Sequence, residues 1–207
     1  MTTTLQHKLN DSVVARWTAL VLVASMMFFA YMFVDVMSPL KSLVEQARGW
    51  DSTTFGTYAA SEYFLNVFVF FLIFAGIILD KMGIRFTGLL SAGLMVAGAS
   101  IKFVGISEWF QATELCAWLD SWWTAFPGSA KMASLGFMIF GCGCEMAGTT
   151  VSKAIAKWFQ GKEMALAMGL EMAIARLGVF AVMWIAPMIS NRYEQSIVAP
   201  VAFCTAL

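Results

Sequence analysis

The sequence is poor in charge. Only 13% of its 207 residues are charged, whereas soluble domains carry about 25%. Thirteen basic residues balance thirteen acidic ones, and the absence of a basic block argues against a nucleic-acid partner. Because 60% of the residues are hydrophobic, too few charges are present to cover a water-facing surface. The composition therefore predicts a protein that lies in the lipid bilayer.

Signals of metal binding and catalysis are also scarce. The single histidine is His7, and the four cysteines form no C-x-x-C pair, so neither a zinc site nor a disulfide framework is indicated. The sequence shows no nucleophile–base pair and no phosphate-binding loop. We therefore expect no enzyme, no cofactor and no metal, and we interpret Cys142, Cys144 and Cys204 as small apolar residues in helices.

Long apolar runs dominate the sequence. A helix needs about 20 mostly apolar residues to cross a bilayer. Five runs are long enough, and a sixth, shorter run continues to Leu207. We predict an all-α, integral membrane six-helix bundle that occupies the whole chain, with an incomplete sixth helix. The predicted helices lie near 17–38, 57–79, 86–106, 132–156 and 164–189, with the partial helix at 197–207.

The loop charges indicate an orientation. If the N-terminus is cytoplasmic, the cytoplasmic loops hold an excess of basic over acidic residues, and the opposite loops do not. The positive-inside rule therefore predicts a cytoplasmic N-terminus. No organelle signal is evident, so we expect a bacterial inner membrane. A chain that stops inside an apolar run is also expected to be part of a longer one.

The outer loop at 108–131 is rich in tryptophan. Its apolar residues recur at helical spacing, at Trp118, Trp122, Trp123 and Phe126. This spacing predicts an amphipathic helix at the outer membrane interface, where tryptophan concentrates. The alternative is a lid or a surface for a partner.

Several charged residues fall inside the predicted helices, among them Asp35, Glu62, Glu145, Glu171 and Arg176. A charge at the bilayer centre costs about 2.5–3.5 kcal/mol on insertion scales, so it usually faces a cavity or a partner. Glu145 and Arg176 lie near the midplane on antiparallel neighbours, and we expect them to meet or to flank one cavity. The alternatives are a structural ion pair for these two, and a solvated cavity wall for Asp35 and Glu62.

Small residues line the predicted helix at 132–156. Gly143 and Ala147 stand four residues apart, a spacing that permits close contact between helices. Gly141 and Gly143 could also leave room for a ligand beside Glu145.

The short loop after the second predicted helix carries a pattern, G-x-x-x-D-K-x-G-x-R. It is formed by Gly76, Asp80, Lys81, Gly83 and Arg85. We expect Gly76 to let a neighbouring helix approach closely and Gly83 to allow a tight turn. Positive-inside anchoring alone would need only the two basic residues of this pattern.

This loop resembles the signature of the major facilitator superfamily, G-x-x-x-D-[RK]-x-G-R-[RK], and departs from it at Ile84. The resemblance implies that the loop is a gating element, that the chain is the N-terminal half of a twelve-helix transporter, and that a C-terminal half closes the cavity. Three further runs, at 140–145, 157–163 and 169–178, resemble the lysosomal dipeptide transporters and their bacterial relatives. That closer resemblance implies that Glu145, Arg176 and Asp35 lie at the substrate.

The function that these features predict is transport of dipeptides or similar small zwitterions by alternating access. Glu145 would bind the ammonium group and Arg176 the carboxylate. One alternative is an organic-anion carrier, in which Arg176 alone binds a carboxylate. Another is a membrane sensor or scaffold that transports nothing. Proton coupling through Glu145 or Glu62 is left open.

Overall fold

The computed structural model describes residues 12–207, and every regular element in that range is a helix. His7 lies outside the described residues. The elements are α1 (Val13–Val34), the 3₁₀ helix η2 (Ser38–Leu40), α2 (Lys41–Arg48), α3 (Ser52–Phe68), α4 (Phe71–Ile106), α5 (Glu108–Gln111), α6 (Glu114–Ser121), α7 (Gly128–Trp158), α8 (Met164–Arg192) and α9 (Val198–Ala206).

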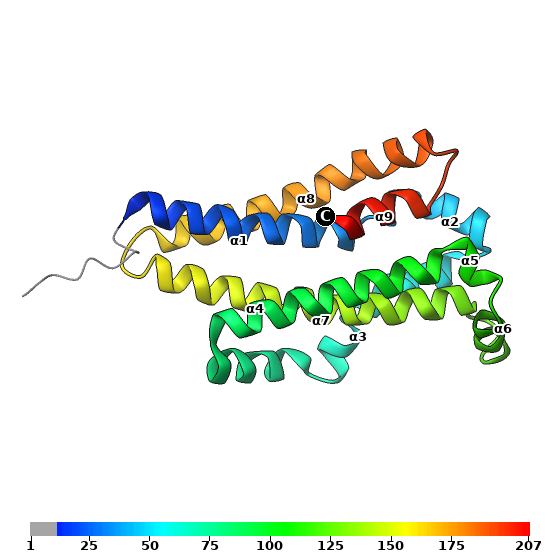
Figure 1. Ribbon diagram of the computed structural model, residues 1–207, viewed down its shortest axis with the longest axis horizontal. Helices are drawn as coiled ribbons and strands as arrows, with labels where there is room; N and C mark the ends of the chain where they lie inside the picture. Colours follow the sequence, from blue (N-terminus) through cyan, green and yellow to red (C-terminus); the bar gives the residue numbers. More distant parts are fainter. Residues whose placement is uncertain (1–11) are drawn as a thin grey trace, which may run out of the picture.

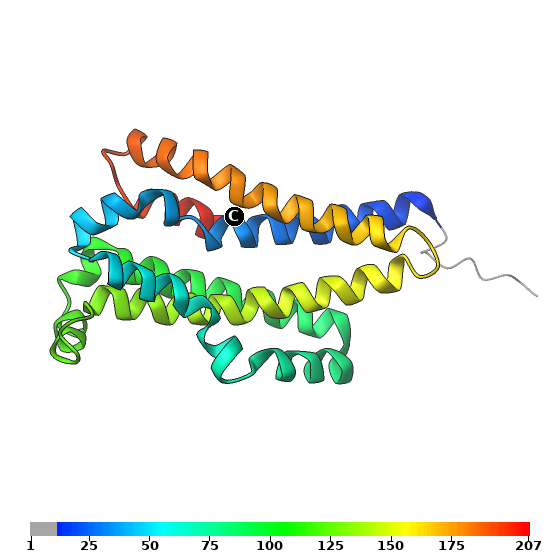
Figure 2. The same cartoon turned by 180° about the vertical axis from the view of Figure 1, so that it is seen from behind.

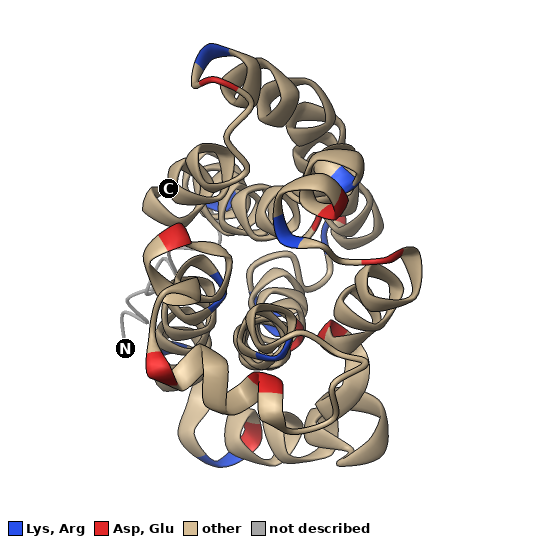
Figure 3. Cartoon of the chain, turned by 90° about the vertical axis from the view of Figure 1, so that its right-hand side faces the viewer, with Lys and Arg blue, Asp and Glu red and all other residues tan. Residues whose placement is uncertain are grey.

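The long helices form two layers (Figures 1 and 2). One layer holds α1, α8 and α9, and the other holds α3, α4 and α7. The short helices α2, α5 and α6 gather at one end of the bundle, which Figure 3 shows end-on. Charged residues are few in that view, and most of the ribbon carries none.

Four segments are long and apolar enough to cross a bilayer: 13–48, 71–106, 128–158 and 164–192. This finding agrees with the prediction of an all-α membrane protein. The other two predicted spans are shorter, since α3 has 17 residues and α9 has 9, below the roughly 20 that a span needs. The described residues therefore show four candidate spans, and six are not confirmed.

The helix predicted at 57–79 is interrupted. Here α3 ends at Phe68 and α4 begins at Phe71, with Phe70 between them in the left-handed region at φ 54°. A second break follows at Gly83, with φ 81° and ψ 173°, so α4 has two arms, 71–82 and 84–106. The expected tight turn at Gly83 is confirmed. The expectation for Gly76 is wrong, because an added Cβ there would meet nothing within 4 Å.

Glycine contacts hold α4 against α7. A Cβ at Gly98 would lie 2.3 Å from the Phe140 backbone nitrogen, and a Cβ at Gly143 would lie 2.8 Å from that of Met95. Such contacts confirm close packing through small residues. They also exclude the expected ligand space, because the backbone of Glu62 on α3 fills the position beside Gly141, 2.2 Å from its Cβ site.

The outer loop is two short helices and a turn, so a single helix through Trp122 is wrong. The helix α6 ends at Ser121 because the following backbone is extended at Trp122 and left-handed at Trp123, where φ is 38°. Lys131 Nζ donates to the carbonyls of Leu119, at 2.5 Å, and of Trp122. Trp118, Trp122 and Trp123 stay exposed. Their place at the membrane interface stays a prediction.

The same end of the bundle is closed by capping interactions. Arg48 Nη2 donates to the Ile106 carbonyl at 2.8 Å, which places a cation at the C-terminus of α4. Asp51 caps α3 by accepting from the Thr54 backbone nitrogen at 2.7 Å. Hydrogen bonds from Thr54 lower the pKa of the Asp51 carboxyl. These contacts fix the ends of α3 and α4, and therefore fix where α3 presents its side chains.

Candidate functional site

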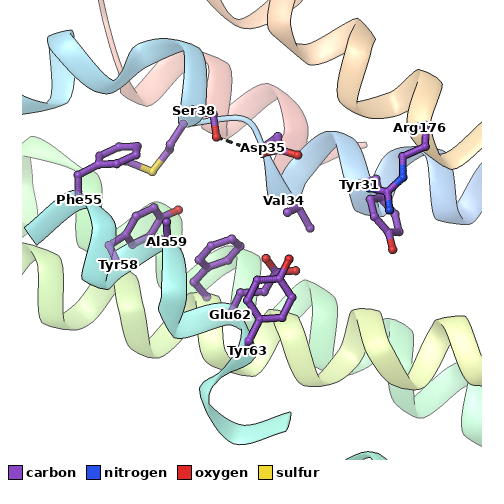
Figure 4. A pocket seen from close by; sticks show the side chains of 12 residues that line it. Tyr31, Val34, Asp35, Ser38, Phe55, Tyr58, Ala59, Glu62, Tyr63 and Arg176 are labelled. Atoms are coloured by element: carbon purple, nitrogen blue, oxygen red, sulfur yellow. Dashed lines mark hydrogen bonds between the residues drawn. The ribbon is translucent and has the colours of Figure 1, made fainter. Parts of the chain in front are cut away.

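A cavity of about 250 Å³ lies between the two layers (Figure 4). Its walls come from α1, the turn after it, α3, α7 and α8. The lining combines aromatic rings with three charged groups: Tyr31, Val34, Asp35, Met37, Ser38, Phe55, Tyr58, Ala59, Glu62, Tyr63, Phe137 and Arg176.

Arg176 provides the positive wall of the cavity. The close approach of α8 to α1 at Gly178, whose Cβ site is 2.1 Å from the Phe28 carbonyl, brings Arg176 beside Tyr31. The guanidinium carbon lies 5.0 Å from the centre of the Tyr31 ring, in cation–π contact. The Arg176 side chain is exposed, and the hydrogen bonds and ion pairs within residues 12–207 give it no acceptor. Its N–H groups are therefore available to a ligand.

Asp35 and Glu62 provide the negative walls, from the two layers (Figure 4). Asp35 follows the last residue of α1 and accepts from Ser38 Oγ at 3.1 Å. Glu62 is 5% exposed, held by the tight α3–α7 contact at Gly141. Tyr63 lies beside the Glu62 carboxylate. The cavity is thus lined by two carboxylates and one guanidinium.

Glu145 is the predicted site residue that the cavity lacks. It is half-buried on α7 and is not part of the cavity lining. In the described part of the chain no ion pair joins it to Arg176. The structure therefore brings Asp35, Glu62 and Arg176 to one cavity and leaves Glu145 outside its lining.

No protein-family model, no curated protein and no solved structure matches the chain. Function therefore rests on the geometry of the site.

The motif loop contacts α7 through its acidic residue, Asp80. Asp80 forms an ion pair with Lys153 at 2.6 Å, and Lys153 also donates to the Leu79 carbonyl at 3.4 Å. This contact joins the first arm of α4 to the C-terminal half of α7. Lys81 and Arg85 are exposed, and they make no ion pair with the described residues.

Sequence reasoning missed Lys102. Near the end of an apolar run, a lysine is expected to extend its charge toward the interface. Instead, its side chain is fully buried beside the cavity, among aromatic rings. One signal could have found it: Lys102 shares a helical face with Gly98 and Gly105, four residues before and three after it. Both glycines pack against α7, so this face is a helix contact and is closed to water.

Among the described residues, no three His, Cys, Asp or Glu side chains gather closely enough to hold an ion.

Proposed function

We propose that this chain is the N-terminal half of a secondary transporter of the major facilitator type, and that it carries dipeptides or similar small zwitterions. The observation that carries the proposal is the cavity, which has an open guanidinium on one wall and two carboxylates on others. Transporter sites of this class lie near the membrane midplane, between packed helices.

The chemistry of the cavity matches a zwitterion. Arg176 can donate two parallel hydrogen bonds to a carboxylate, a geometry that lysine does not offer. Glu62 and Asp35 can accept from an ammonium group at the other end. A volume of about 250 Å³ lies just below the roughly 300–1,000 Å³ of drug-sized sites, which suits a ligand of two small residues.

The same walls disfavour an organic anion. Two carboxylates facing the cavity would repel a ligand that carries only negative charge, and Arg176 alone would have to offset both. A ligand with its own ammonium group neutralises this wall. The proposal therefore assigns ammonium binding first to Glu62 and Asp35, which line the cavity, ahead of Glu145, which does not.

Alternating access needs elements that change partners. The Asp80–Lys153 pair joins the motif loop to α7, and we propose that it breaks when the two halves rock. The exposed apolar face of the first α4 arm, which includes Ile73, Phe74 and Ile77, would contact lipid or the second half. The proposed setting is a bacterial inner membrane with a cytoplasmic N-terminus.

Ligand binding by the 207-residue chain tests the proposal. Dialanine, N-acetyl-dialanine and dialanine amide are titrated in detergent micelles by calorimetry. Acetylation removes the ammonium group and amidation removes the carboxylate, so both changes should weaken binding about tenfold or more, the loss of one charge-assisted hydrogen bond. Equal binding of dialanine and its acetylated form would instead favour the organic-anion carrier.

A further inference from the structure

Lys102 lies in a closed cage. Its side chain is fully buried on the second arm of α4. The ammonium nitrogen is 4.1 Å from the centre of the Phe137 ring, 4.3 Å from that of Phe33 and 5.5 Å from that of Tyr58. It donates to the Phe33 carbonyl at 3.4 Å. These groups come from α1, α3 and α7, so three helices meet at one cation.

The cage has the features that bind an organic ammonium ion. Aromatic faces attract a cation through their quadrupoles. The Phe33 carbonyl belongs to the last turn of α1, the negative end of that helix dipole. No carboxylate in the described part of the chain lies within 4 Å of the Lys102 nitrogen, so the rings and the carbonyl are its direct partners.

A sodium ion would fit the same cage poorly. Hard inorganic cations prefer several oxygen ligands at short distance. Within residues 12–207, the Phe33 carbonyl is the one oxygen to which Lys102 donates. A primary ammonium group needs fewer oxygens because the rings attract its charge. The surroundings therefore distinguish ammonium from sodium.

We propose that Phe33, Tyr58 and Phe137, with the Phe33 carbonyl, form a binding site for a primary ammonium ion, and that Lys102 fills this site as a tethered ligand. Tyr58 and Phe137 also line the cavity, so the cage and the cavity share a wall. Lys102 is then a positioning residue that holds the end of α1 against α7. The cage itself does not depend on the proposed transport function; only its influence on dipeptide binding does.

The test is chemical rescue of Lys102→Ala with ethylammonium, which replaces the end of the lost side chain. Thermal unfolding of the chain is followed in detergent with ethylammonium chloride, sodium chloride or tetraethylammonium chloride at one ionic strength. Lys102→Ala should unfold at a lower temperature than the native chain, and ethylammonium alone should raise its Tm in a saturable way. Lys41→Ala is the control, because Lys41 is a half-exposed lysine that also lies near one ring. It should show no such response.

Equal effects of the three salts on Lys102→Ala would overturn the proposal. If Lys102→Ala does not fold, Lys102→Met decides, since methionine fills the cage without a charge. It should fold with a lower Tm than the native chain and should not respond to ethylammonium. A Lys102→Met protein with the native Tm would show that the cage needs no cation. None of these results depends on dipeptide binding, so the proposed function can fail independently.

Discussion

Lys102 and Arg176 both lie over aromatic rings, and they differ in what completes their surroundings. Lys102 is fully buried. Its ammonium nitrogen lies 4.1 Å and 4.3 Å from the centres of two rings and 5.5 Å from the centre of a third. Arg176 is exposed and lies over the single ring of Tyr31. Lys102 lies where glycines bring α4 and α7 into close contact. Arg176 lines the cavity, near the close contact of α8 with α1 at Gly178. A cation that the protein surrounds holds helices together, whereas one with open donors can bind a ligand.

The largest effect on stability is expected from Gly136→Ala, which disrupts the packing around Lys102. An added Cβ would lie 2.3 Å from the Lys102 backbone nitrogen, so the helices must separate. We expect a loss of about 2–3 kcal/mol in the free energy of unfolding, the upper range for overpacking. Gly169→Ala, on the helix of Arg176, is the control, because its Cβ meets nothing within 4 Å. Equal stability of the two variants in denaturant titration would contradict the close contact.

Arg176→Gln should change binding and leave stability intact. Charge-assisted hydrogen bonds contribute about 1.5–3 kcal/mol, so dialanine affinity should fall roughly tenfold to a hundredfold in calorimetry. The Tm should stay near that of the native chain, because the side chain is exposed. Arg192→Gln, at the exposed end of the same helix, should bind normally. A similar loss of dialanine affinity in both variants would show that Arg176 has no specific role in binding.

Comparing Glu62→Gln with Glu145→Gln identifies the acid that binds the ammonium group. Glu62 lines the cavity and Glu145 does not, so Glu62→Gln should weaken dialanine binding several-fold more. Binding of N-acetyl-dialanine should be unchanged or improved in Glu62→Gln, since one repulsive charge is gone. Loss of binding in Glu145→Gln alone would instead support the sequence-based prediction, in which Glu145 binds the ammonium group and Arg176 the carboxylate.

The smallest effect is expected from Lys153→Met, which removes a cation paired at the surface. Both partners of the Asp80–Lys153 pair are exposed, and exposed pairs contribute about 0.2–1 kcal/mol. Lys157→Met, one turn further on α7 and also exposed, serves as the control. A stability loss well above 1 kcal/mol for Lys153→Met would mark the pair as structural and argue against its release during transport.

The fold could be predicted where hydrophobic run length decides it. The sequence predicted three helices to within about four residues of their ends: the second arm of α4, the helix α7 and the helix α8. This was possible because a run of about 20 apolar residues indicates a membrane-spanning helix. The break between α3 and α4 could not be predicted, since neither glycine nor proline stands at 68–71. Phe70 adopts a left-handed conformation that phenylalanine rarely takes, and nothing in the local sequence explains it.

The site could be predicted in part, from charges that an apolar helix would otherwise exclude. Asp35, Glu62 and Arg176 were found this way, and the structure gathers them around one cavity. The rotation of each helix could not be predicted, and rotation decides whether a side chain reaches the cavity. For this reason Glu145 was expected on the wall, and the burial of Lys102 was missed.

Uptake of labelled dialanine into proteoliposomes is the most direct test of the central claim. The chain is assayed together with a C-terminal half, as the native protein and as Arg176→Ala. The account predicts saturable uptake by the native protein and little uptake by the variant. Uptake of small carboxylates but of no dipeptide by the native protein would contradict the zwitterion site and favour an organic-anion carrier.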